Sequence, residues 1–145
     1  MTDVYHSGLD KNPANYSSLS PVDFLGRSAT VFPGKTAVID QQSYSYLQLY
    51  KRVVRMASSL SSMGIGRNDT VSVLCFNTLE LLETHYSVPM LGAVLNTLNT
   101  RQDAASLRYI LAHCESSVLI YDTEFESLVG QIIDDLDKPP ALIAI

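Results

Sequence analysis

The chain of 145 residues lacks tryptophan, has only two cysteines and contains no long hydrophobic run. Cys75 and Cys114 form no CxxC pair and no disulfide framework, which favours a reducing compartment over secretion. We expect both to be packed apolar thiols. No apolar stretch reaches the roughly 18 residues that a membrane span requires, and residues 1–13 lack the apolar centre of a secretory signal. The composition therefore predicts a cytoplasmic protein without a transmembrane segment.

Basic residues are also few. Ten lysines and arginines stand against fifteen acidic residues, giving a net charge of −5, and the basic residues are scattered singly from Lys11 to Lys138. Nucleic-acid binding requires a basic stripe or patch, so this class of partner is excluded. The 46% of hydrophobic and 17% of charged residues are typical of a globular domain, and the length allows one core.

The chain divides into an arm and a domain. Residues 1–19 are polar and predict an extended N-terminal arm, whereas residues 20–145 predict one α/β unit. Ser20 is placed as the N-cap of a first helix, and Ser45 with Gln48 predicts a capping box for the second. The predicted helices cover residues 21–31, the segment from Ser45 to a closing Gly64, a segment after the N-cap Asn77 that Pro89 ends or kinks, and residues 103–114 and 124–133.

Short apolar segments alternate with these helices. They are Thr36–Ile39, Thr70–Phe76, Ala93–Asn96, Ser117–Tyr121 and Pro139–Ile145. Strands separated by helices of this length pair in parallel through right-handed crossovers. The predicted fold is a three-layer α/β structure, with a mostly parallel sheet and helices on both faces. Because the last segment is apolar on both faces and no helix follows to cover it, we expect the chain to be the front part of a longer protein.

Gly64-Ile65-Gly66 invites comparison with a dinucleotide-binding loop. That fingerprint requires a strand before the glycines and a helix after them, and here the order is reversed. The pattern therefore predicts a helix C-cap followed by a tight turn that uses Asp69.

The histidines and Cys114 could supply nucleophilic chemistry. His113 stands next to Cys114 at the end of a helix, and His85 lies one turn before Pro89. Sequence neighbours on a helix point apart, and no third orienting group is evident. We predict structural roles for both histidines, and likewise for His6 in the arm.

Two acidic groups are predicted to be solvated faces. Glu80 and Glu83 share one side of a helix, and Asp134, Asp135 and Asp137 form a short run. Neither group has a histidine or cysteine at ligand spacing.

Asp40 and Asp122 each follow a predicted strand, at the edge where open parallel sheets bind ligands. A small Mg²⁺ or phosphoacceptor site is one interpretation, and two ordinary turns are the other.

The segment Asn96–Arg101 is the densest polar cluster of the sequence. Its amides and hydroxyls favour bracing of the loop backbone, and Arg101 as a clamp for a carboxylate or phosphate is the alternative.

The run VPMLGAVLNTLNTR, from Val88 to Arg101, closely resembles the N-terminal region of the AMP-forming acyl-CoA synthetases, the adenylate-forming ligase superfamily. Its Asn96–Arg101 portion resembles the branch of short- and medium-chain fatty-acid and methylthiopropionate ligases. Further likenesses stand in the order and spacing of the family at Asn15–Tyr16, Leu19–Pro21, Phe24–Leu25, Gly64–Gly66, Asp69–Val73, Val118–Ile120 and Asp122.

The resemblance implies a two-step ligase. ATP and a carboxylic acid give an acyl-adenylate and pyrophosphate, and the thiol of coenzyme A then displaces AMP; Mg²⁺ assists the first step. The phosphate loop, the Tyr-Gly-x-Thr-Glu segment and the catalytic lysine of the family have no counterpart in these 145 residues. We therefore assign no catalytic, cofactor-binding or metal residue and expect the fragment to be inactive without the rest of its own ligase chain.

Two rival hypotheses remain open at this point. In one, the chain is a stand-alone, non-enzymatic α/β module in which Asp40 and Asp122 form a Mg²⁺ or phosphoacceptor site. In the other, residues 1–19 are an oligomerisation strap, and the parent enzyme is a homo-oligomer.

Overall fold

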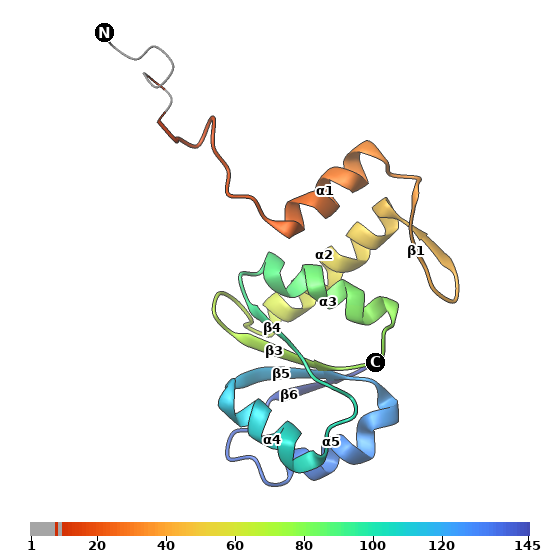
Figure 1. Ribbon diagram of the computed structural model, residues 1–145, viewed down its shortest axis with the longest axis vertical. Coiled ribbons are helices and arrows are strands. Elements are labelled where there is room, and N and C mark those ends of the chain that lie inside the picture. The colour runs from red at the N-terminus through yellow and green to blue at the C-terminus, as the bar shows by residue number, and fades with distance from the viewer. Residues whose placement is uncertain (1–7, 9) are drawn as a thin grey trace.

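A four-stranded parallel sheet lies between two layers of helices in the computed structural model, which describes residue 8 and residues 10–145 (Figure 1). The strand order is β4-β3-β5-β6. The strands are β3 (Thr70–Leu74), β4 (Val94–Thr97), β5 (Ser116–Tyr121) and β6 (Ala141–Ala144). The helices are α1 (Pro21–Val31), α2 (Tyr46–Ser62), α3 (Leu79–Met90), α4 (Ala104–His113) and α5 (Glu126–Ile133). The predicted three-layer α/β fold is confirmed.

The two central strands carry side chains alternately to the two helical layers. Val71 and Val73 on β3, with Val118 on β5, pack with residues of α2 and α3. Leu74 and Leu119 point to the opposite face and pack with α4 and α5. Strands covered on both faces lose the polar alternation of half-exposed ones, which is why most residues of β3 and β5 are apolar. The core therefore lies on both sides of β3 and β5.

The first predicted strand does not belong to this sheet. Thr36–Ile39 is β1, and it pairs antiparallel with a short strand that was not predicted, β2 (Ser43–Ser45). The chain turns back over the three residues 40–42, too few for the crossover that a parallel neighbour requires. The hairpin lies beside α2, and the Ile39 side chain is largely exposed. The prediction of five strands in one sheet was therefore wrong by one.

Local signals place the first two helices accurately. Ser20 caps α1, and the reciprocal hydrogen bonds of Ser45 and Gln48 form the predicted capping box of α2. At the end of α2, Gly64 has a φ of 88°, and the Ile65 N–H donates to the Leu60 carbonyl over 3.1 Å. These features define a Schellman C-cap. The Gly66 N–H donates to the Asp69 carboxylate over 2.8 Å, so the prediction of a C-cap and turn is confirmed.

The later elements differ from expectation by a few residues. Thr78, not Asn77, caps α3, because its hydroxyl accepts from the Leu81 N–H. Pro89 is tolerated because α3 ends one residue later, where the lost N–H interrupts little of the helix. A short 3₁₀ turn, Thr123–Phe125, precedes α5.

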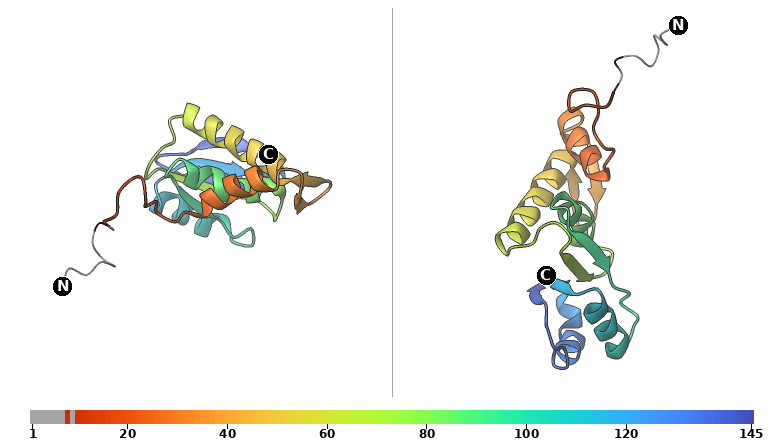
Figure 2. Two further views of the ribbon diagram at one scale, coloured as in Figure 1. Left: turned by 90° about the horizontal axis from the view of Figure 1, so that it is seen from above. Right: turned by 90° about the vertical axis from the view of Figure 1, so that its left-hand side faces the viewer.

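The arm and the first helix extend away from the sheet. α1 packs on α2 and α3, and residues 10–19 form neither helix nor strand beyond it (Figure 2). Across the described part of the chain, no helix is both long and apolar enough to cross a membrane.

Candidate functional site

A cavity of about 430 Å³ opens at the carboxyl ends of β3 and β4, beside α3. This edge is where parallel α/β sheets bind ligands, because the chain leaves each strand there through a loop. The lining residues are Val73, Cys75, Asn77, Leu81, His85, Thr97, Leu98, Asn99 and Thr100.

The polar segment after β4 forms one wall of this cavity and is braced by its own hydrogen bonds. The Leu98 N–H donates to the Val73 carbonyl over 2.8 Å, tying the loop to β3. The Asn99 side-chain oxygen accepts from the Arg101 N–H over 2.9 Å. The predicted bracing role is thus confirmed, while Arg101 is exposed and its role as an anion clamp stays a prediction.

Cys75 lies at the floor of the cavity with only 6% of its surface exposed. Burial raises the pKa of its thiol to about 11, and the nearby negative charge of Asp122 adds to this effect. The thiolate is the nucleophilic form of cysteine, so Cys75 is unreactive at neutral pH. The prediction of a packed apolar thiol is confirmed for this residue.

His85 lines the cavity from α3. Its Nδ1 atom lies 2.8 Å from the carbonyl oxygen of Leu81, one turn earlier on the helix. A carbonyl can only accept, so Nδ1 is the donor of this hydrogen bond. His85 is therefore held by the backbone of its own helix, in agreement with a structural role.

His113 and Cys114 do not form a catalytic pair. The His113 ring stacks on Tyr109, with centroids 5.7 Å apart, on the exposed side of α4. The Cys114 sulfur instead lies 3.4 Å from the side-chain nitrogen of Asn96, beneath the sheet. The two side chains point apart as predicted. His6 lies outside the described residues.

Cys114 has polar surroundings, which the sequence interpretation missed. Its sulfur lies 3.8 Å from the Ser72 hydroxyl, which also accepts from Asn96 over 3.0 Å and from Ser116 over 2.8 Å. These residues come from β3, β4 and β5 and from the end of α4, so they meet only in the folded chain. Cys114 is half-buried, and the prediction of a second packed apolar thiol was wrong.

Glu83 corrects a second prediction. Its side chain is 3% exposed and forms an ion pair with Arg52 of α2, whereas Glu80 meets the same arginine at 3.3 Å. The hydrogen bond to Glu83 raises the pKa of Arg52 further, so the guanidinium remains charged. The signal for burial was present, because Glu83 follows the buried Leu79 by four residues and therefore shares its helix face.

Asp40 and Asp122 do not meet. Asp40 is exposed at the turn of the β1–β2 hairpin, where its N–H donates to the Gln42 carbonyl. Asp122 follows β5 and caps the 3₁₀ turn by accepting from the Glu124 N–H over 3.0 Å. Among the residues that the structure describes, no group of three or more histidine, cysteine, aspartate or glutamate side chains could hold a metal ion. The geometry supports two turns and does not favour a Mg²⁺ or phosphoacceptor module.

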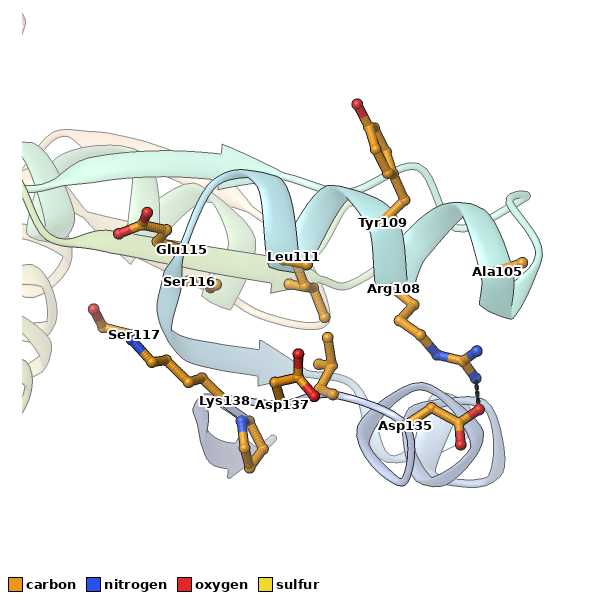
Figure 3. Close-up of a pocket in the computed structure, with 13 residues that line it drawn as sticks. Ala105, Arg108, Tyr109, Leu111, Glu115, Ser116, Ser117, Asp135, Asp137 and Lys138 are labelled. Carbon is orange, nitrogen blue, oxygen red and sulfur yellow. Dashed lines mark ion pairs between the residues drawn. The ribbon is translucent and has the colours of Figure 1, made fainter.

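A larger cavity, of about 780 Å³, lies at the opposite edge of the sheet, between α4 and the loop before β6. Two of its charged groups, Arg108 and Asp135, serve the structure itself. Arg108 donates to the Gln131 carbonyl over 2.6 Å and pairs with the exposed Asp135 at 2.9 Å (Figure 3). Arg108 thus closes the end of α5, and the acidic run is a solvated face, as predicted.

Comparison with known proteins identifies the family. Residues 25–144 match the family described as AMP-binding enzyme. The chain is 40% identical to an acetate–CoA ligase of Humulus lupulus, over 94% of its own length and 26% of that protein. It is 43% identical to a peroxisomal butyrate–CoA ligase of Arabidopsis thaliana, over 83% of its length and 21% of that protein.

The fold gives the same answer. The crystal structure of an anthranilate–CoA ligase in complex with anthranoyl-AMP superposes with a TM-score of 0.81 and 26% sequence identity. The match covers 86% of this chain and 24% of the ligase. The chain therefore spans about a quarter of the length of the relatives it matches. On these grounds it belongs to the AMP-binding enzyme family.

Proposed function

We propose that this chain is the N-terminal part of an AMP-forming acyl-CoA ligase that activates a short- or medium-chain carboxylic acid. The family match over residues 25–144 carries the proposal. Two of its relatives are named as acetate–CoA and butyrate–CoA ligases, which supports a small aliphatic substrate. In the two steps of such an enzyme, ATP and the carboxylate give an acyl-adenylate, and coenzyme A then forms the thioester.

The described carboxylates do not fit a site for Mg²⁺. The candidate carboxylates Asp40 and Asp122 belong to different parts of the fold, and no three-ligand group is present among the described residues. Cys75 is buried and protonated at neutral pH, so it supplies no nucleophile. We propose that this part of the ligase shapes the domain around the reaction and is inactive by itself.

The test compares the 145-residue chain with the full-length protein of its gene. Each is incubated with ATP, Mg²⁺ and acetate, butyrate or octanoate, and pyrophosphate release is measured. We expect release by the full-length protein alone, and we expect it to depend on the carboxylate. Acyl-CoA should form only when coenzyme A is added. A full-length protein that releases no pyrophosphate with any carboxylate contradicts the ligase proposal, and release by residues 1–145 contradicts their inactivity.

The substrate class has its own comparison. A benzoate–CoA ligase of Arabidopsis thaliana is 44% identical over 81% of the chain, so an aromatic acid is the rival substrate. We expect kcat/KM to be higher for butyrate or octanoate than for benzoate. The reverse order would contradict the aliphatic branch and leave the family assignment intact.

The cellular location stays a prediction. Two of the relatives named above are peroxisomal enzymes, and the composition of this chain predicts the cytoplasm. Imaging of the full-length protein with a fluorescent tag would distinguish the two.

A further inference from the structure

An apolar hollow of about 640 Å³ adjoins the carboxyl-end cavity, between the first residue of α1 and the outer side of α3. It is lined by Pro21, Asn77, Thr78, Leu81, Leu82, His85 and Tyr86. Three of these residues, Asn77, Leu81 and His85, also line the carboxyl-end cavity. The two spaces therefore share one wall, and whatever covers the hollow also covers one side of the cavity.

The N-terminal arm ends at the rim of this hollow. Just over half of residues 10–19 are polar, and the segment includes two large apolar side chains, Tyr16 and Leu19, which are 48% and 86% exposed. Leu19 stands two residues before Pro21, which forms part of the wall of the hollow. An extended chain spans at most about 3.3–3.6 Å per residue, so Tyr16 can reach about 17 Å from Pro21. Both side chains are therefore held close enough to reach the hollow.

The present contacts of the arm are local. The Tyr16 N–H donates to the Asn12 carbonyl over 2.9 Å, and the Lys11 ammonium lies 4.3 Å from the centre of the Tyr16 ring. Neither contact resists a swing of the arm about residues 19–20, because both move with it. A leucine left in water beside an open apolar surface loses the free energy that burial would supply.

We propose that residues 16–19 are a strap that closes over this hollow, with Leu19 and Tyr16 against Leu81, Leu82 and Tyr86. The occupant is the chain's own arm, because it is attached at the rim and carries two exposed apolar side chains that match the apolar lining of the hollow. In the closed position the strap narrows the entrance to the carboxyl-end cavity along its shared wall. This closure is a conformational change of the chain itself, and the proposal does not depend on which substrate the protein uses.

The absence of tryptophan makes the test direct. In the full 145-residue chain, Tyr16→Trp places a single tryptophan on the strap, and Ile39→Trp places one at an exposed position of the hairpin as a reference. We expect the emission maximum of the strap variant to lie at shorter wavelength than that of the reference variant. We also expect acrylamide to quench the strap tryptophan severalfold more slowly than the reference tryptophan. Equal quenching in both variants would overturn the proposal.

Charges placed in the hollow then test where the strap lies. Each charge is combined with Tyr16→Trp. Leu82→Asp should restore fast quenching, and so should His85→Asp, which is the milder change because His85 is exposed. Val54→Asp, on the outer side of α2, should leave the protection unchanged. Protection that survives both substitutions in the hollow shows that the arm packs elsewhere and overturns the proposal. Protection that disappears on dilution shows arms packing between copies, which also overturns it and favours an oligomerisation strap.

Discussion

Two arginines join helix pairs on opposite faces of the sheet, and the surroundings of their partners differ. Arg52 of α2 meets Glu83 of α3, whose side chain is 3% exposed, whereas Arg108 of α4 meets Asp135 after α5, whose side chain is 67% exposed. A buried carboxylate that loses its partner keeps the cost of desolvation, but an exposed one is simply hydrated. We therefore expect the loss of Arg52 to destabilise the α2–α3 side strongly and the loss of Arg108 to destabilise the α4–α5 side only weakly.

Apolar packing shows no such contrast between the faces. Leu60 of α2 and Leu107 of α4 are both almost completely buried, in the clusters on either side of the sheet. We expect Leu107→Ala to cost about 2–5 kcal/mol of unfolding free energy, from lost transfer free energy and a residual cavity. Leu60→Ala is the matched substitution and should cost a similar amount. Urea unfolding of both variants checks this, and a cost confined to one face would show that the two cores are unequal.

The arginines themselves sharpen the comparison. Because Arg52→Ala leaves Glu83 buried without its partner, we expect a loss of about 3 kcal/mol, at the lower end of the range for broken buried pairs. Arg108→Ala is the control on the other face, and its exposed ion pair predicts about 1 kcal/mol or less.

The double variant Arg52→Met, Glu83→Leu separates charge burial from packing. It should recover most of the stability lost in Arg52→Ala, because no buried charge remains. Chemical unfolding measures all three variants. Equal losses for Arg52→Ala and Arg108→Ala would contradict the role of partner burial.

The reactivity of the two cysteines compares the same two faces of the sheet. Burial raises the pKa of Cys75 from 9.0 to about 11, which lowers its thiolate fraction at neutral pH by about 100-fold. Cys114 is half-buried beneath the opposite face. We expect a thiol reagent at pH 7.5 to modify Cys114 first, with mass spectrometry locating the label. Modification of Cys75 at an equal rate would show that the α3 side opens more readily than its packing implies.

The smallest expected effect lies at the start of α4. Hydrogen bonds from Ser106 lower the pKa of Asp103 below its usual value of 3.8. A lowered folded-state pKa gives stability that is present above 3.8 and is lost as the pH falls through the folded value. The difference in Tm between the wild type and Asp103→Asn should therefore shrink between pH 5 and pH 2. A difference independent of pH would show that the carboxylate charge contributes nothing at this cap.

Local signals predicted most of the elements but not the long-range polar contacts. Ser20 and the Ser45–Gln48 box marked two helices, because capping depends on neighbours in the sequence. The hairpin was missed because its turn contains no glycine and Ser45 was already assigned as a helix cap.

The corrected residues of the site share one property, which is that their partners are far away in the sequence. Glu83 pairs with Arg52 across 31 residues, and Cys114 meets Ser72 across 42. Periodicity identifies which face of a helix is buried, but not which charge on another helix meets it. The carboxyl-end cavity was accessible to prediction because parallel strands end together at one edge.

The strand order determines when each strand can pair while the protein is being synthesised. β3 pairs on one side with β4, 24 residues later at Val94, and on the other with β5, where Val71 meets Val118 after 47 residues. As the chain leaves the ribosome, β3 cannot pair with β5 until residue 118 has been synthesised. Until then the apolar side chains of β3 stay uncovered on that side. Pairings of such separation form slowly. The interval before residue 118 emerges is therefore when the nascent chain has most need of a chaperone.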